Sequence, residues 1–214
     1  MRIGRAFCGG MDLSAGADAV CGEESHEAHD SQCGIDSDRI AERSSFWRMR
    51  TPVIGAINGA AVGAGLTITM LFDIRFVAEE AKLGFVFTRR GVIPDANVTW
   101  LLPRLVGAGR ALDLLMSGRM FRGTDAVRYG LAQESAPASE LLATATAYAR
   151  DLAINASPAT VAATKALTNR FLEHADRESA FALETKLIWW SGEQPDAMEG
   201  VMSFLEKRPP KWQV

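Results

Sequence analysis

Residues 51–73 constrain the fold more than any other part of this 214-residue chain, because they predict a strand, a glycine-rich turn and an apolar helix without a break. Pro52 cannot donate a hydrogen bond to a neighbouring strand, so it suits the first position of a strand. The β-branched residues that follow it, up to Ile57, continue that strand. Asn58-Gly59 then turns the chain.

Small residues at 63–65 precede an apolar helix, which we expect at residues 66–72 and expect to be buried because it is apolar nearly all round. The first N–H groups of a helix have no partners within it, so such a turn can hold an anion or a developing negative charge on oxygen. A tight strand-to-helix turn whose small residues serve packing alone explains the same pattern. The turn by itself leaves a binding role and a packing role open.

A second turn of small residues lies at residues 8–10, after what the sequence predicts to be the end of a strand. Two such turns can direct two N–H donors at one oxygen. Together with residues 52–73, the segment 6–13 resembles the crotonase superfamily, which is the enoyl-CoA hydratase and isomerase family. Residues 84–107 and 199–209 resemble the same family, so the likeness extends over most of the chain.

The resemblance implies an α/β fold, with a crotonase-like core in which successive ββα turns coil into a spiral and a helical C-terminal region that serves trimerisation. We assign the core to residues 1–137 and the helical region to residues 138–214. No short internal repeat in the sequence shows the spiral independently. Family members normally carry several strands and a helix before the first turn, which form part of the coenzyme A site. A chain that begins at this turn is expected to lack those strands and to expose apolar surface.

Local patterns predict further elements. Strand candidates lie at residues 74–78 and 83–87. Helices are expected at residues 99–105, 108–116, 124–130, 141–152, 181–190 and 198–207, and another is expected to begin at Ser157-Pro158. Residues 14–37 are expected to form a mobile loop before a helix that starts at Ile40 with Asp38 as its cap. Strand–turn–helix units thus fill the first half of the chain and only helices fill the second.

In the family that this chain resembles, two backbone N–H groups hold the oxygen of an acyl-CoA thioester and stabilise an enolate. Carried over by motif, the donors here are Met11 and Ala64, and the adjacent Gly10 and Gly63 belong to the substrate site. Because the donors are main-chain groups, the Met and Ala side chains need not impair them, and each donor is typically worth about 3 to 4 kcal/mol. Coenzyme A enters as part of the substrate, so no separate cofactor is implied.

Hydratases of this family place one glutamate just after the second turn and another before a Gly-x-x-Pro segment. This chain has Thr67 and Phe87 at those positions, and neither can replace a carboxylate that activates water. The remaining candidate base is Asp95, directly after Pro94. Some isomerases of the family carry their base at this position, and a dehalogenase-like member carries a nucleophilic aspartate there. Asp95 also suits a helix cap after the proline.

The resemblance therefore implies an enzyme of the enoyl-CoA hydratase/isomerase family that acts on an acyl-CoA thioester and moves a double bond more readily than it adds water. An acyl-CoA hydrolase or dehalogenase with Asp95 as nucleophile is one alternative. A catalytically inert CoA-binding subunit is a second alternative, motivated by Thr67, Phe87 and the short N-terminus. The acyl chain itself cannot be read from the sequence.

The C-terminal region carries the residues that the resemblance assigns to a neighbouring subunit. Phe204 and Lys207 match family positions that contact coenzyme A across the subunit boundary, although Lys207 also suits a solvated surface charge. We expect a homotrimer or a hexamer, since closed symmetric assemblies are the usual outcome. Trp189, Trp190 and Trp212 supply apolar area for such contacts.

Composition argues against several other classes of protein. The net charge of −3 gives no general reason to expect nucleic acid. No apolar run reaches the roughly 18 to 20 residues of a membrane span. Three cysteines without paired spacing fit a reducing compartment, and the start has no signal-peptide layout, so we expect a cytoplasmic protein. His26 and His29 have no matching cluster of ligating residues, so no metal site is expected.

Overall fold

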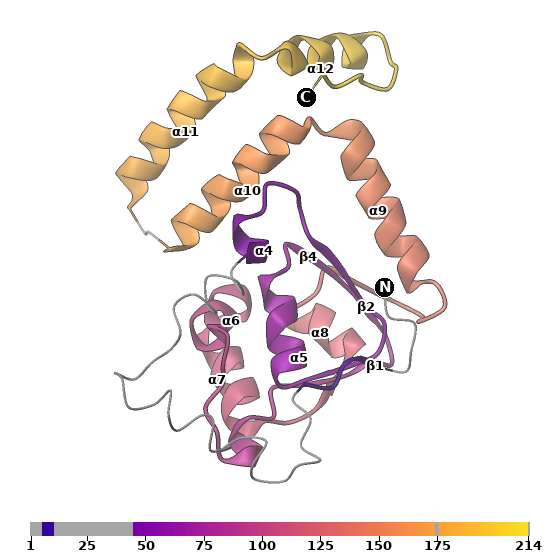
Figure 1. The fold of residues 1–214 in the computed structure, drawn as a ribbon, viewed down its shortest axis with the longest axis vertical. Helices are drawn as coiled ribbons and strands as arrows, with labels where there is room; N and C mark the ends of the chain where they lie inside the picture. The colour runs from indigo at the N-terminus through magenta and orange to yellow at the C-terminus, as the bar shows by residue number, and fades with distance from the viewer. Residues whose placement is uncertain (1–5, 11–44, 174–175, 214) are drawn as a thin grey trace. The chain divides into compact units, whose positions relative to one another are not determined.

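The computed structural model describes residues 6–10, 45–173 and 176–213 (Figure 1). These residues form two compact units. The first unit comprises residues 6–10, 45–47 and 54–144, and the second unit comprises residues 48–53, 145–173 and 176–213. The division falls inside helix α9 (Leu141–Asn155), between Thr144 and Ala145.

The first unit contains a three-stranded parallel sheet and a four-stranded sheet. The three-stranded sheet has the order β2 (Ile54–Ile57), β4 (Ile74–Ala78), β7 (Glu134–Ala136). The four-stranded sheet has the order β1 (Ala6–Cys8), β3 (Ala60–Val62), β5 (Lys82–Gly84), β6 (Phe121–Arg122). Within this second sheet, β1, β3 and β5 are parallel and β6 pairs antiparallel with β5.

The chain alternates between the two sheets. It leaves β2 through the bend at Asn58-Gly59 and enters β3 in the other sheet, and it then repeats the step from β4 to β5. Strands from successive turns therefore stack in parallel on one another, β2 on β4 on β7 in one sheet and β1 on β3 on β5 in the other. This arrangement is the predicted spiral of ββα turns, and the fold prediction is confirmed.

Helices join these strands in the first unit. The predicted apolar helix is α5 (Ala64–Thr67), which starts two residues earlier than expected and tightens into the 3-10 helix η1 (Ile68–Leu71). The other elements are α4 (Ser45–Arg48), the 3-10 helix η2 (Thr88–Arg90), α6 (Val98–Val106), α7 (Ala108–Ser117) and α8 (Gly123–Tyr129). Helices α6 and α7 lie side by side (Figure 1). The three predicted helices in this stretch are confirmed to within one residue at each end.

The hydrophobic core of the first unit lies between its sheets and helices. Its largest fully buried apolar side chains are Leu66, Val77, Leu83, Phe85, Val98, Leu102, Leu114, Leu131 and Leu141. One cation is buried beside them, since Arg75 is only 3% exposed. Its guanidinium donates to the carbonyl oxygens of Thr69, Phe72 and Leu131. Arg75 therefore ties the end of η1 and the segment before β7 to strand β4.

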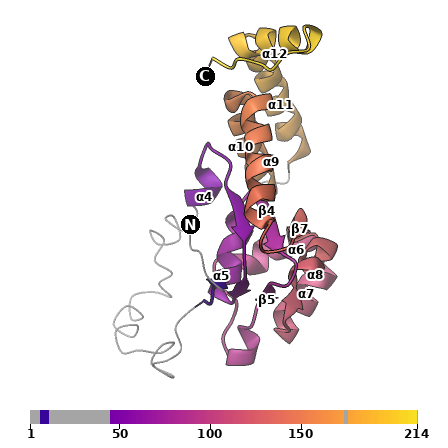
Figure 2. The same ribbon diagram turned by 90° about the vertical axis from the view of Figure 1, so that its right-hand side faces the viewer.

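The second unit contains the remaining helices, α10 (Pro158–Glu173), α11 (Arg177–Gly192) and α12 (Pro195–Leu205), with α9 from Ala145 onward (Figure 2). All four helices were predicted from the sequence. The described part of the chain holds no helix that is both long and apolar enough to cross a membrane.

Two secondary-structure predictions are wrong. Only helices were expected in the second half of the chain, but β6 and β7 lie there, because strands of two and three residues arise from pairing with β5 and β4 and not from a local pattern. The strand expected at residues 83–87 starts at Lys82 and ends at Gly84. The loop expected at 14–37 and the start of the helix at Ile40 lie outside the described residues.

Candidate functional site

The two small-residue turns meet in the structure, as the sequence predicts. A Cβ added to Gly65 would overlap the carbonyl oxygen of Cys8, so the end of β1 lies directly against the start of α5. Gly10 has a φ of 85°, and a Cβ there would be 2.6 Å from the carbonyl oxygen of Val62 and 3.7 Å from the backbone nitrogen of Ala64. Only glycine fits at these two positions.

Ala64 is the first residue of α5, so its N–H group has no acceptor within the helix. Gly63 before it has φ 54° and ψ −127°, a conformation that suits glycine. The carbonyl oxygen of Gly63 accepts from the N–H groups of Leu66 (2.9 Å) and Thr67 (3.0 Å). Within the part of the chain that the structure describes, the N–H of Ala64 donates to no acceptor. The predicted second donor, Met11, lies outside the described residues.

Asp95 and Thr67 are brought together from positions 28 residues apart. The Thr67 hydroxyl oxygen is 3.0 Å from Oδ1 of Asp95, and it is also 3.0 Å from the carbonyl oxygen of Ala64. The Thr67 side chain is 1% exposed, whereas Asp95 is half-buried. The candidate base therefore lies at the first turn of α5, next to the residue with the available N–H group.

Asp95 is not a helix cap, which corrects one of the two roles expected for it. Helix α6 begins at Val98, and the capping position is occupied by Asn97, whose side chain makes no capping hydrogen bond. The Asp95 carboxylate instead accepts from Thr67. Ala96 and Asn97 both adopt left-handed backbone conformations, with φ of 51° and 59°. Such residues cost energy and persist where the surroundings fix them, which is common beside functional groups.

Phe87, at the second glutamate position, contributes no acid–base group. It is half-buried, and its carbonyl oxygen accepts from the N–H groups of Arg90 (2.8 Å) and Val92 (3.2 Å), which shapes the turn around η2. The preceding Val86 lies against the turn, because a Cβ on Gly63 would be 3.9 Å from its Cγ2. Val86 thus gives the site an apolar wall that the sequence did not indicate.

The first unit therefore unites Gly10, Gly63, Ala64, Thr67 and Asp95. Sequence reasoning treated Thr67 only as the absence of a glutamate and missed it as the hydrogen-bond partner of Asp95. No local signal marks that contact, because the two residues belong to different segments.

Phe204 and Lys207 belong to the second unit. Phe204 on α12 is 81% exposed. Lys207, just beyond α12, is exposed and has a left-handed φ of 53°. Its N–H donates to the carbonyl oxygen of Phe204, and the N–H of Arg208 donates to that of Ser203, which closes the end of the helix.

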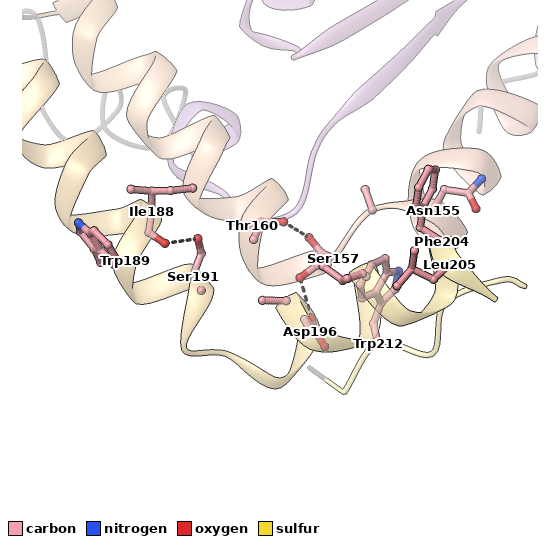
Figure 3. A pocket seen from close by; sticks show the side chains of 15 residues that line it. Asn155, Ser157, Thr160, Ile188, Trp189, Ser191, Asp196, Phe204, Leu205 and Trp212 are labelled. Atoms are coloured by element: carbon pink, nitrogen blue, oxygen red, sulfur yellow. Dashed lines mark hydrogen bonds between the residues drawn. The ribbon is translucent and has the colours of Figure 1, made fainter. Parts of the chain in front are cut away.

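An open apolar groove of about 830 Å³ runs along the second unit (Figure 3). Ile188, Trp189, Phe204, Leu205 and Trp212 line it with large side chains. The exposed fraction is 74% for Trp189 and 40% for Trp190, while Trp212 is half-buried. The predicted tryptophans thus present apolar surface in the described structure.

The described residues contain no group of three or more His, Cys, Asp and Glu side chains that could hold a metal ion. His26 and His29 lie outside them. Cys8 carries a free thiol, and Cys21 and Cys33 are not among the described residues.

Comparison with known proteins identifies the relatives of this chain. The sequence profile described as "Enoyl-CoA hydratase/isomerase" matches residues 3–214. The protein named enoyl-CoA hydratase ACTT3 from Alternaria alternata is 39% identical over 211 residues, which cover 98% of this chain and 68% of that protein.

Solved structures agree with the sequence comparison. A crystal structure named a probable enoyl-CoA hydratase/isomerase from Mycobacterium abscessus matches with a TM-score of 0.76 at 39% identity, over 78% of this chain and 65% of that one. An enoyl-CoA hydratase from Polaromonas sp. JS666 matches with a TM-score of 0.82 at 25% identity, over 98% of this chain and 79% of that one. The chain thus spans about two thirds of the length of the Alternaria and Mycobacterium proteins.

Proposed function

Because the chain belongs to the enoyl-CoA hydratase/isomerase family, we propose that it binds acyl-CoA thioesters and moves a double bond along the acyl chain. The observation that carries this proposal is the 3.0 Å hydrogen bond from the Thr67 hydroxyl to the Asp95 carboxylate. Through this bond, a carboxylate from one segment lies beside the turn that carries the N–H of Ala64. An acid–base group next to a free donor is what enolate chemistry requires.

The proposed binding step uses backbone donors. The thioester oxygen accepts hydrogen bonds from the N–H of Ala64 and, by family resemblance, from that of Met11. Gly10 and Gly63 keep side chains away from this point, since a Cβ on Gly10 would come within 3.7 Å of the Ala64 nitrogen. Donors that are already in place stabilise negative charge as it develops on the thioester oxygen.

The proposed chemical step is a proton transfer. Asp95 removes a proton from the acyl chain of the bound enoyl-CoA, and the electron pair of the broken C–H bond delocalises toward the thioester oxygen. Asp95 then returns the same proton to a different carbon, so the double bond has moved and no atom has been added or lost. One carboxylate is sufficient for this reaction.

Hydration is a weaker fit to the residues of this site. The two-glutamate route needs a carboxylate at both motif positions, whereas this chain has Thr67 and Phe87 there. Two of the relatives named above are called enoyl-CoA hydratases. The experiment below therefore also measures hydrated product, and it measures free CoA released by attack of an Asp95 nucleophile.

The test is a small panel of 2-enoyl-CoA and 3-enoyl-CoA thioesters, incubated with the parent protein and with Asp95→Asn. We expect double-bond migration with the parent, and a loss of about 10²- to 10⁴-fold in rate with the variant, as for removal of a general base. Asp113→Asn is the control, since Asp113 is an exposed carboxylate of the same unit that pairs with Arg119. Hydrated product or free CoA instead of migrated double bonds would redirect the assignment, and no turnover of any thioester would favour a binding subunit.

We also propose that copies of the chain assemble as a trimer or a dimer of trimers through the apolar surface of the second unit. Trp189 and Phe204, 74% and 81% exposed, are the most exposed large apolar side chains of this unit among the described residues. Closed symmetric assemblies are the usual way to cover such patches. Light scattering at micromolar concentration measures the mass directly, with Trp189→Glu as the disrupting variant. A monomeric parent protein would contradict this assembly.

A further inference from the structure

Thr67 is the most deeply buried polar side chain at the proposed site. Its residue is 1% exposed, and its hydroxyl oxygen lies 3.0 Å from two acceptors, Oδ1 of Asp95 and the carbonyl oxygen of Ala64. A hydroxyl carries one proton, so it donates to one of these acceptors at a time. An ionised aspartate can only accept, which favours donation to Asp95 while the carboxylate is charged.

We propose that Thr67 is a positioning residue for the proton-transfer step: its hydroxyl holds Oδ1 of Asp95 and leaves Oδ2 to take the substrate proton. This inference rests on the proposed function and adds to it a residue that does not touch the substrate. Hydrogen bonds in which the acceptor is a charged carboxylate are about twice as strong as bonds between neutral groups.

The backbone around Asp95 supports this role. Ala96 and Asn97 in left-handed conformations fix the turn, and the carbonyl oxygen of Asp95 accepts from the N–H of Val98 at 3.1 Å. The turn fixes the position of the Asp95 backbone, and the hydrogen bond from Thr67 fixes the position of its carboxylate. A base held at both points keeps its reactive oxygen at one distance from the N–H of Ala64.

The second acceptor of Thr67 serves the protonated state of the base. When Asp95 has taken a proton on Oδ2, its carboxyl group is neutral and needs the Thr67 bond less. The Thr67 hydroxyl can then rotate and donate to the carbonyl oxygen of Ala64, 3.0 Å away, without moving the backbone. The Thr67 proton stays on Thr67 throughout, and the substrate proton alone moves to Asp95 and back. The buried Thr67 hydroxyl therefore has an acceptor in either state.

The experiment compares Thr67→Val, Thr67→Ser and the matched control Thr69→Val. Thr69 is 0% exposed and its hydroxyl donates to the carbonyl oxygen of Leu66 at 2.7 Å, three residues earlier, so it resembles Thr67 in burial and backbone bonding. Among the described hydrogen bonds, the Thr69 hydroxyl makes none to Asp95. The readouts are kcat, KM and Tm, with the thioester that the parent protein isomerises fastest.

We expect Thr67→Val to lower kcat by about 10- to 100-fold, the effect of losing a hydrogen bond to a charged group. KM should change less than about threefold, because the hydroxyl does not touch the substrate in this scheme. Thr67→Ser should restore most of kcat, and Thr69→Val should keep the parental kcat. A parental kcat for Thr67→Val would overturn the inference, as would an equal loss with serine at this position.

The double variant Thr67→Val with Asp95→Asn separates this inference from the proposed function. If Thr67 acts through Asp95, the double variant should be no slower than Asp95→Asn alone. A further loss in the double variant would show that Thr67 acts independently of Asp95 and would overturn the inference. If Asp95→Asn itself turns over at the parental rate, the proposed function fails. If only Asp95→Asn is slow and Thr67→Val is not, the proposed function stands and the positioning role alone is lost.

Discussion

The two units of this chain differ in how many apolar side chains they bury. The first unit encloses aliphatic and aromatic residues such as Leu83 and Phe85, each 2% exposed or less. Among the described residues of the second unit, Ala145 is the one buried hydrophobic residue, and the other buried side chains are Ser157, Lys165, Asp196 and Ser203. The first unit thus has a hydrophobic core, whereas most large apolar side chains of the second unit are exposed or only partly buried.

Polar contacts take the place of a core in the second unit. Asp196 accepts from the Ser157 hydroxyl at 2.7 Å and from the N–H of Gln213 at 2.8 Å (Figure 3 shows the first of these). The indole N–H of Trp212 donates to the carbonyl oxygen of Ile154 at 2.9 Å. These bonds fix the last residues against α9 and α12, and they join α12 to Ser157, the residue before α10. The exposed apolar side chains of the second unit are the surface that the proposed assembly would cover.

The largest expected effect belongs to the first unit and concerns the N–H of Ala64. Ala64→Pro removes that donor, while proline is tolerated at the first position of a helix. We expect kcat to fall by about 10² to 10³, as for loss of one oxyanion donor, with little change in Tm. Ala64→Gly keeps the N–H and is the control, which should remain within a few-fold of the parent. A proline variant that turned over at the parental rate would show that the donor lies elsewhere.

The next effect concerns the buried cation of the first unit. Burial lowers the pKa of Arg75 to about 10, so it remains charged at neutral pH and donates to three carbonyl oxygens. Arg75→Met would remove the guanidinium donor from all three carbonyls, and only that of Thr69 has a second donor among the described hydrogen bonds, the N–H of Phe72. We expect a loss of about 2 to 4 kcal/mol in the free energy of unfolding. Urea denaturation measures it, with the exposed Arg104→Met as control. A loss below about 1 kcal/mol would mean that water or a shifted side chain satisfies these carbonyls.

Elements with a local sequence pattern could be predicted, whereas elements that depend on pairing with distant strands could not. Strand β4 was predicted at its observed bounds because its apolar run ends at the charged pair Glu79-Glu80. Helices α6 to α12 carry caps or periodic apolar faces that reveal them locally. Strand β3 was missed because Ala60 and Ala61 favour no strand by themselves, and the pairing with β1 and β5 decides their conformation.

The candidate site was predictable in its motifs and not in its contacts. A turn of small residues has a local signature, and resemblance to the family then gave Gly10, Gly63 and Ala64 their expected roles. The hydrogen bond between Thr67 and Asp95 depends on the fold of the 28 residues between them. Likewise, Asp95 after a proline predicts a cap, yet the left-handed Ala96 and Asn97 move the helix start away from it.

A smaller effect is expected in the second unit, where Glu199 holds the C-terminal residues. Hydrogen bonds from Arg208 and from the N–H of Lys211 lower the pKa of Glu199 to about 2, below its usual 4.5. A carboxylate with a lowered folded-state pKa contributes stability that is fully present above pH 4.5 and is lost as the pH falls through about 2. Exchange of the Lys211 amide hydrogen reports on this contact.

We expect Lys211 to be protected at neutral pH in the parent and to lose that protection across this acid range. In Glu199→Gln, the protection of the Lys211 amide relative to its intrinsic exchange rate should be lower at neutral pH and should change little between pH 4.5 and pH 2. Glu206→Gln is the control, since Glu206 pairs with Arg208 without contacting the Lys211 amide in the described structure. Equal protection in all three proteins would show that Glu199 does not hold the tail.

Substitutions of Lys207 should change the stability of the second unit least, and they test whether this residue serves folding or acyl-CoA binding. Lys207 occupies a left-handed position at the end of α12, where glycine is preferred. Lys207→Gly should raise the free energy of unfolding by up to about 1 kcal/mol, because the strain of a side chain at positive φ is removed.

If Lys207 contacts coenzyme A from a neighbouring copy, the same change should weaken acyl-CoA binding. Lys207→Asn tolerates the left-handed conformation and also lacks the charge, so it should weaken binding to a similar extent with less gain in stability. Calorimetric titration with an acyl-CoA and urea denaturation measure the two effects separately. A higher free energy of unfolding with unchanged acyl-CoA binding in both variants would identify Lys207 as a surface charge at a strained helix end.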